Sequence, residues 1–397
     1  MKLNQGLHLA YCTNIHRGQD WPQTFDSLER YTLRVREQVC PREAYAIGLR
    51  LGDQAARELA EPATLLAFQH WLDANDCYVF TINGFPYGAF HGQRVKEQVY
   101  APDWTTPERL DYTIRLFELL AKLTPPGVEG SVSTVPCSFK EFIQSEEQVA
   151  VMRRNLWQCV ERIEQLSEAS GKTLHLGLEP EPLCYLETTD ETIRFFDQLR
   201  ADRTHDDRLS RRLGVNYDTC HLAVEFEDAP ASLERLRRAD IMLSKLHLSS
   251  ALTARPTPET RAALAAFADD IYFHQVVSRS ATGELTRVKD LNLALEAAAQ
   301  ANGVAAEAPE WRIHFHIPLH SPAAPLFGNT TDHLLGALDT LQANPGMCHH
   351  LEMETYTWEV LPSQIKNRDV VTQLVAEYDW TLRELTQRGL GPATPPP

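Results

Sequence analysis

Short apolar segments alternate with segments of helical periodicity along almost the whole chain. Most of the apolar segments are apolar on both faces, as strands buried in a parallel sheet are. Amphipathic stretches such as residues 149–166 and 371–385 lie between them. Repeated strand-then-helix units predict right-handed crossovers and one parallel sheet. The strand candidates are GLHLAYCT, AYAIGLRLG, CYVFTING, GSVSTVP, LHLGLEP, LGVNYDT, IMLSKLHLS, IYFHQVV, WRIHFHIP and HHLEMETYTW.

A closed (β/α)8 barrel, the TIM barrel of the α/β class, is the expected form of this sheet. The chain has 397 residues, a length that barrels of this kind often use as a single domain. An open doubly wound sheet is the alternative, and it is disfavoured because no Gly-rich fingerprint follows the first strand. We therefore expect one barrel domain over residues 1–388 and a disordered, Pro-rich tail over residues 389–397.

The chain has more strand candidates than a barrel of eight strands can use. We expect IYFHQVV and ELTRVKD to form a hairpin around residues 281–284. This hairpin would belong to an insertion of hairpin and helix, over about residues 252–320, that follows the strand carrying His247. WRIHFHIPLH is either part of the insertion or a barrel strand.

Composition limits which binding partners and which cell compartment we expect for this protein. The formal net charge is −16, which disfavours nucleic acid as a partner because an acidic surface repels phosphates. Eight cysteines are dispersed without a Cys-x-x-Cys pair, which argues against a disulfide framework or a zinc knuckle. Residues 1–20 do not resemble a secretory signal, and no apolar run is long enough to span a bilayer. We expect a cytoplasmic protein that acts on a small molecule.

Four strand candidates end in side chains that bind metals. LHLGLEPEP delivers Glu179, NYDTCH delivers Asp218, KLHLSS delivers His247 and LEMETYTWEV delivers Glu354. Carboxylates at the ends of buried strands are unfavourable unless something binds there. The sequence therefore predicts a divalent metal ion at one mouth of the barrel. Three carboxylates and one imidazole suit Mn²⁺, Mg²⁺ or Co²⁺, and Zn²⁺ is the further alternative.

Two of these ligands have an acidic neighbour that competes for the role. Pro180 and Pro182 end the strand of LHLGLEPEP. Glu179 therefore lies nearer to this strand, and Glu181 would be a solvated loop acid. In the last segment, Glu354 is nearer to the carboxyl end, where barrel active sites lie. Glu352 would be one layer deeper and would need a buried partner such as Lys245 or a histidine.

The remaining candidates have structural alternatives. Asp218 could simply cap a helix, and a lone strand histidine such as His247 is often only hydrogen-bonded. His221, three residues after Asp218, can face the same site across a strand-to-helix turn. The residues that fall at or near the same strands and could add to the site are His8, His16, Asn83, Glu181, Lys245, His314, His316 and Glu352.

In kind and order, this set resembles the ligands of the xylose-isomerase-like TIM barrels. Those barrels use a strand Glu, an Asp in a D-x-x-H turn, a strand His and a last-strand Glu, and the resemblance assigns the substrate-side role to His221. More closely, the chain resembles the EboE family of "metabolite traffic" proteins of ebo gene clusters. The resemblance implies the movement or modification of a secondary-metabolite or lipid-like precursor, with other ebo-cluster proteins as partners. The supporting strings are HLAYCTNIH, NGFPYGAFHG, STVPCSFK, LEPEP, NYDTCH, KLHLSSAL, HFHIPLH and LEMETYTW.

The resemblance implies isomerase or epimerase chemistry on a polyol-like hydroxy-carbonyl compound. The metal would hold adjacent oxygens and stabilise an enediolate, Glu179 and Glu354 would move the proton, and His221 would hold a substrate hydroxyl. Two alternatives stay open. One is a non-catalytic protein that binds or carries a metabolite. The other is a phosphodiester hydrolase of the endonuclease branch, for which His8, His314 and His316 would be further ligands.

Overall fold

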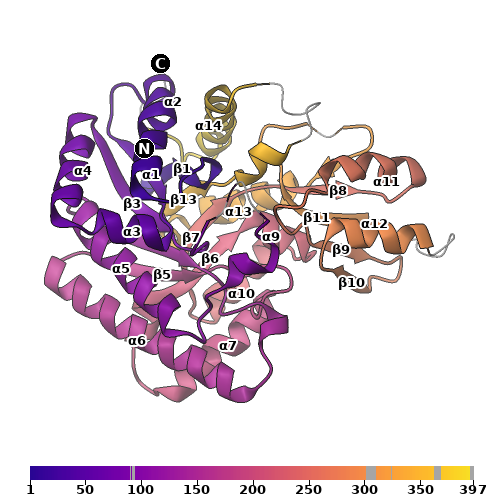
Figure 1. The fold of residues 1–397 in the computed structure, drawn as a ribbon, viewed down its shortest axis with the longest axis horizontal. Helices are drawn as coiled ribbons and strands as arrows, with labels where there is room; N and C mark the ends of the chain where they lie inside the picture. The colour runs from indigo at the N-terminus through magenta and orange to yellow at the C-terminus, as the bar shows by residue number, and fades with distance from the viewer. Residues whose placement is uncertain (90, 92–93, 301–309, 323, 362–367, 394–397) are drawn as a thin grey trace.

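Eight parallel strands form the body of the molecule in a computed structural model, which describes residues 1–397 except 90, 92–93, 301–309, 323, 362–367 and 394–397. Their order in the sheet is β1-β13-β7-β6-β5-β4-β3-β2, and a parallel bridge between Cys12 and Gly48 brings the first and last strands of this order together. The predicted (β/α)8 barrel is confirmed (Figure 1). The strands are β1 (His8–Tyr11), β2 (Tyr45–Arg50), β3 (Cys77–Asn83), β4 (Gly130–Thr134), β5 (Leu174–Leu178), β6 (Leu213–Asp218), β7 (Met242–Leu248) and β13 (His350–Met353).

Amphipathic helices follow the strands and cover the outside of the barrel. The helix predicted over residues 149–166 is α6 (Glu146–Ser170), and it ends at Gly171, whose φ of 66° is readily adopted by glycine. The last predicted helix is α14 (Val370–Gln387). The others are α1 (Trp21–Ser27), α2 (Leu33–Val39), α3 (Asp53–Leu59), α4 (Pro62–Ala74), α5 (Pro107–Leu123), α7 (Thr189–Asp202), α8 (Arg208–Arg212), α9 (Thr219–Val224), α10 (Ala229–Arg238) and α13 (Thr331–Ala343).

A second, antiparallel sheet follows β7 and projects from one side of the barrel (Figure 1). Its order is β10-β9-β11-β8-β12. WRIHFHIPLH supplies β11, so this segment belongs to the insertion and not to the barrel. The elements are β8 (Ala251–Ala254), α11 (Pro258–Leu264), β9 (Val276–Arg279), β10 (Leu285–Val288), α12 (Leu291–Gln300), β11 (Glu310–His316) and β12 (Gly328–Asn329).

The predicted hairpin is present as β9 paired with β10, but it starts later than the sequence indicates. The expectation of a strand over IYFHQVV is wrong for residues 271–275, because this stretch packs against the loop after β3. The carbonyl of Ile271 accepts the amides of Val95 and Lys96 at 2.9 and 3.1 Å. The segment 271–275 therefore lies over the mouth of the barrel.

Charged contacts fix the insertion to the barrel. Arg287 of β10 contacts Glu187, after β5, at 2.8 Å and also pairs with Glu225, after α9. The guanidinium of Arg312 donates to the carbonyl of Ala223 at 2.7 Å. These contacts set the position of β11 relative to the strand ends that carry the predicted ligands.

The two ends of the described chain meet beside the barrel. The amide of Asn4 donates to the carbonyl of Gly391 at 3.0 Å, and Leu390 is buried. Of the tail predicted over residues 389–397, residues 394–397 lie outside the described residues. Within the described part of the chain, no helix combines the length and apolar character that crossing a membrane requires.

Candidate metal centre

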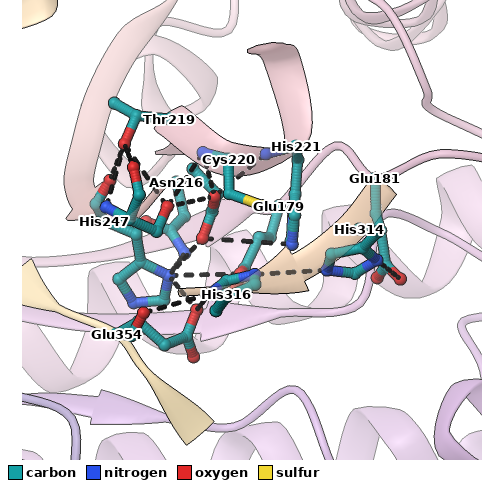
Figure 2. A network of polar contacts seen from close by, with 12 residues as sticks. Glu179, Glu181, Asn216, Thr219, Cys220, His221, His247, His314, His316 and Glu354 are labelled. Carbon is teal, nitrogen blue, oxygen red and sulfur yellow. Dashed lines mark hydrogen bonds and ion pairs between the residues drawn. The ribbon is translucent and has the colours of Figure 1, made fainter. Parts of the chain in front are cut away.

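The side chains of Glu179, Asp218, His247 and Glu354 converge at the carboxyl ends of four barrel strands. Each offers one ligand atom, and these atoms all lie within 4.8 Å of one another. His247 Nδ1 is 3.2 Å from Glu179 Oε1, 3.5 Å from Asp218 Oδ2 and 3.1 Å from Glu354 Oε2. Figure 2 shows the side chains of Glu179, His247 and Glu354 pointing toward one another. The structure thus brings together the four residues that the sequence analysis selected as ligands.

Two buried carboxylate oxygens in this cluster can still accept a hydrogen bond or bind a cation. Among the described residues, Glu179 Oε2 and Asp218 Oδ2 have no hydrogen-bond partner. An unpaired buried carboxylate oxygen is unfavourable by about 1–3 kcal/mol or more. The residues therefore fit a divalent cation, which would bind at these carboxylates and offset two of their three negative charges.

The electrostatics of His247 lead to the same conclusion. Burial acts to lower the pKa of His247, but the carboxylates of Glu354 and Glu179 outweigh it and raise this pKa well above its usual value. The cluster thus attracts positive charge at the Nδ1 atom of His247. A metal ion bound there would replace the proton.

Asp218 serves as a helix cap and a cluster member at the same time. Its Oδ1 accepts the amides of Cys220 and His221 at 2.7 and 3.1 Å and the hydroxyl of Ser249 at 2.6 Å. Its Oδ2 points toward His247. The two interpretations of Asp218 from the sequence are therefore compatible, because each uses a different oxygen.

Glu354 is held by two amides from the first part of the chain. Its Oε1 accepts Asn14 Nδ2 at 2.6 Å and Asn83 Nδ2 at 3.1 Å. Asn83 was among the additional candidates, whereas Asn14 was missed. Its position directly after the first strand, in HLAYCTN, was the available signal.

A buried ion pair supports the cluster from below. Glu352 Oε2 lies 2.7 Å from His247 Nε2 and 2.5 Å from Lys245 Nζ. This places Glu352 one layer deeper than Glu354, with the partners that the sequence analysis required. A carboxylate on the far nitrogen of a ligand histidine fixes the ring orientation, so Glu352 and Lys245 position His247.

Glu181 is buried, and the expectation of a solvated loop acid is wrong. Its Oε1 accepts the hydroxyl of Tyr100 at 2.6 Å and the Nε2 of Gln275 at 3.1 Å. Burial raises its pKa to about 8, together with the nearby negative charge of Glu179 and against the effect of these hydrogen bonds. Tyr100 and Gln275 come from the loop after β3 and from the insertion, and no sequence pattern marked them.

Three histidines form a second group beside the four ligands. The ring of His221 lies 4.5 Å from that of His314 and 5.4 Å from that of His316, centroid to centroid. Asp218, His221 and His316 offer ligand atoms within 4.8 Å of one another, as do Cys220, His314 and His316. Figure 2 shows His314 and His316 reaching the cluster. The insertion therefore contributes to the site through β11.

Hydrogen bonds fix which nitrogen of each ring faces the group. The Nδ1 atoms of His221, His314 and His316 lie 2.7–3.0 Å from oxygens of Pro180, Gln275 and Glu354 respectively. Since these oxygens accept, the Nδ1 atoms carry hydrogen and the Nε2 atoms carry lone pairs. The Nε2 atoms of His314 and His316 are 3.2 Å apart. Converging lone pairs favour a shared proton or a cation.

A pocket opens on the cluster from the side of the insertion. Its polar lining includes Glu179, Glu181, His221, His314 and Glu354. The same pocket is lined by the apolar side chains of Phe85, Val95, Val99 and Phe273, together with Lys96 and three tyrosines. A ligand in the pocket therefore meets carboxylates and imidazoles as well as hydrocarbon.

Two of the additional candidates lie away from the cluster. His8 begins β1, at the opposite end of the barrel, and its Nδ1 lies 2.7 Å from the hydroxyl of Tyr78. His16 lies 2.9 Å from the hydroxyl of Tyr11 and stacks on Tyr31. Position near a strand end selected both residues, but it does not distinguish the two ends of the barrel or the direction of the side chain.

Several solved structures are similar to this chain. A D-tagatose 3-epimerase-like protein is 10% identical, with a TM-score of 0.50 over 96% of this chain and 98% of that chain. L-ribulose 3-epimerase is 12% identical, with a TM-score of 0.49 over 98% and 96%. A xylose isomerase-like TIM barrel protein from Mycobacterium smegmatis in complex with magnesium is 12% identical, with a TM-score of 0.49 over 96% and 97%.

No family model and no curated protein matches the sequence. The similarity to the D-tagatose 3-epimerase-like protein shows the fold. The resemblance to the EboE family stays a prediction.

Proposed function

We propose that this protein is a divalent-metal-dependent isomerase or epimerase that removes a proton from the carbon next to the carbonyl of a hydroxy-carbonyl compound and returns a proton to the same or the adjacent carbon. The observation that carries the proposal is the convergence of Glu179, Asp218, His247 and Glu354 within 4.8 Å, with two carboxylate oxygens unpaired among the described residues. When bound, a divalent cation supplies a Lewis acid that polarises a carbonyl and acidifies the neighbouring C–H bond. Mn²⁺, Mg²⁺ and Co²⁺ suit the carboxylate-rich donor set, and Zn²⁺ is also compatible.

The two glutamates differ in their hydrogen bonds. Glu354 Oε1 accepts two amide hydrogens, from Asn14 and Asn83. Glu179 Oε2 lacks such a donor among the described residues and lines the pocket. We assign to Glu179 the removal of the proton and to Glu354 its return from the other side.

Two further residues can hold the oxygens of the substrate. His221 presents Nε2 to the cluster and accepts a substrate hydroxyl. Glu181, with a pKa raised to about 8 by burial, is mostly protonated at neutral pH and can donate to an oxygen as the charge on the substrate changes. Both residues line the same pocket.

The apolar residues of the pocket indicate the chemistry of part of the substrate. Phe85, Val95, Val99 and Phe273 offer hydrocarbon surface beside the carboxylates and imidazoles. We therefore infer a substrate with an apolar portion next to its hydroxy-carbonyl group. This inference agrees with the predicted link to a lipid-like or secondary-metabolite precursor. A protein that only carries such a compound would bind it without turnover.

Metal content and isotope exchange test the proposal. Wild-type protein is expected to bind a divalent metal and to transfer deuterium from D₂O to the carbon next to the carbonyl of a substrate in a hydroxy-carbonyl panel. Glu179→Gln should lower the exchange rate by at least about 10²–10⁴-fold, the usual contribution of a general base, because it removes a base and a metal ligand together. Glu168→Gln, on the exposed face of α6, is the control. Metal-free wild-type protein, or full exchange in Glu179→Gln, would contradict the proposal.

The second group of histidines favours one alternative, a phosphodiester hydrolase with two metals. Two adjacent ions can hold both the attacking and the leaving oxygen of a phosphate ester, and Asp218 lies between the two groups. His316→Gln should then remove one metal equivalent together with hydrolysis of bis(p-nitrophenyl) phosphate. Under the isomerase proposal, wild-type protein does not hydrolyse this ester.

A further inference from the structure

A cluster of histidines lies at the end of the barrel opposite to the candidate metal centre. Glu129 directly precedes β4, His175 lies on β5 and His350 begins β13. Each offers one ligand atom, and these atoms lie within 4.8 Å of one another. His175 Nε2 is 3.7 Å from Glu129 Oε2, and the rings of His175 and His350 are 5.2 Å apart. None of these residues takes part in the chemistry proposed above.

The tautomer of His350 is fixed by its surroundings. Its Nδ1 lies 2.7 Å from the hydroxyl of Ser131, and that hydroxyl donates its hydrogen to Thr81 at 2.8 Å. Ser131 therefore accepts from Nδ1–H, and the Nε2 atom of His350 carries a lone pair. His350 is 1% exposed, and its Nε2 has no hydrogen-bond partner among the described residues.

His175 is held in a similar way. Its Nδ1 lies 2.7 Å from the hydroxyl of Ser244, and the ring is 3% exposed. Its Nε2 faces Glu129, which is half-exposed and also lies 3.4 Å from His349 Nδ1. Ser244 can accept from Nδ1–H, which leaves the Nε2 of His175 free to bind a cation. Two buried imidazoles held at Nδ1 and a carboxylate open to solvent therefore make a preformed set.

We propose that Glu129, His175 and His350 form a second, independent metal site, with two imidazole nitrogens and one carboxylate oxygen as ligands. Nitrogen-rich sets of this composition suit Zn²⁺, and Co²⁺ as its substitute. Two nitrogen ligands of one zinc ion lie about 3.3 Å apart. Glu129 can complete the site by a side-chain movement because it is half-exposed, and water would fill the fourth position.

The placement of the three residues indicates a structural role. In the sheet order β1-β13-β7-β6-β5-β4-β3-β2, the strand β13 lies across the barrel from β4 and β5. An ion bound to all three residues would link opposite walls at the end away from the chemistry. An ion that binds only the folded chain stabilises the fold by mass action.

Zinc titration of chelator-stripped, full-length protein tests the site. Wild-type protein should bind one more equivalent of Zn²⁺ than His350→Gln or Glu129→Gln, and Zn²⁺ should raise the Tm of wild type more than that of either variant. Glu129 is half-exposed, so Glu129→Gln keeps the test usable if His350→Gln fails to fold. The exposed His70→Gln is the control for non-specific binding.

Two results would overturn the proposal. One is equal zinc stoichiometry in wild type and folded Glu129→Gln. The other is a crystal soaked in Zn²⁺ without anomalous density between His175 and His350. The candidate metal centre at the other end of the barrel is tested separately, because Glu179→Gln should remove metal there and leave the equivalent bound by His175 and His350.

Discussion

At the scale of single residues, Gly48 and Glu352 share one small space inside the barrel. A β-carbon at position 48 would overlap Glu352 Oε1 and would lie 2.7 Å from the carbonyl oxygen of Tyr11. Glycine at this position therefore admits the carboxylate that orients His247. The lack of a side chain on β2 is part of the candidate metal centre, although Gly48 binds nothing itself.

We expect Gly48→Ala to lower the free energy of unfolding by about 1–3 kcal/mol, the range for overpacking a filled core. It should also weaken metal binding, because displaced Glu352 no longer holds His247. Urea unfolding and metal titration measure the two effects. Gly346→Ala is the matched control, because its β-carbon would meet nothing within 4 Å among the described residues. Unchanged stability and metal affinity in Gly48→Ala would refute this account.

At the scale of elements, one carboxyl on α14 connects three parts of the chain. Glu377 Oε1 accepts the amide of Leu319, after β11, and the Nε2 of Gln373, at 3.3 and 3.2 Å. Its Oε2 accepts the hydroxyl of Thr355, after β13, at 3.0 Å. Burial raises the pKa of Glu377 from 4.5 to about 7, although these hydrogen bonds act to lower it.

The raised pKa predicts a pH-dependent stability. The folded state holds this proton more tightly than the unfolded state, so the contribution of Glu377 is full below about pH 4.5 and is lost as the pH rises through 7. Glu377→Gln removes the titration. Its amide oxygen can still accept from Leu319 and Gln373, and its NH2 group would donate to the Thr355 hydroxyl, which reverses that hydrogen bond. Between pH 4.5 and pH 8, the free energy of unfolding of the variant should therefore rise relative to that of wild type by up to about 3 kcal/mol. Urea unfolding of both proteins across this range measures the gain, and parallel pH profiles would contradict it.

The elements of the barrel could be predicted from the sequence because their signal is local. Apolar runs on both faces marked β1 to β7 and β13, and Pro180 and Pro182 marked the end of β5. The partners of the second sheet are not a local property. The strand β11 reads like a barrel strand, and only its pairing with β8 and β9 places it in the insertion.

The residues of the candidate site also differ in how well the sequence alone predicts them. Glu179, Asp218, His247 and Glu354 stand out because an acid or histidine at the end of an apolar strand is unusual. Asn14, Tyr100 and Gln275 do not, because loops bring them to the cluster through contacts distant in sequence. The burial of Glu181 was missed for this reason, since the insertion covers it.

At the scale of the whole molecule, the eight cysteines report on the integrity of the packing. All eight are free and buried, and burial raises the pKa of the thiols, most strongly for residues such as Cys137 and Cys184. A buried thiol of high pKa reacts slowly, because the thiolate is the reactive form.

We expect native protein to show no fast-reacting thiol with DTNB and to show eight in denaturant. Labelling rates along a urea series should follow the unfolding seen by circular dichroism, because the thiols become accessible when the barrel opens. A thiol that reacts quickly without urea would mean that its part of the barrel opens independently of the rest.

The hydrogen bond between Asn14 and Glu354 joins two segments that are synthesised at very different times. During synthesis the N-terminal segments fold first, but the acid that Asn14 holds belongs to the turn after β13, the final barrel strand. A nascent chain that stops before this strand has neither a closed wall nor a complete set of ligands. The completed chain would therefore be the first form able to bind the metal ion. Prematurely terminated chains would lack the ion and the stability that it gives.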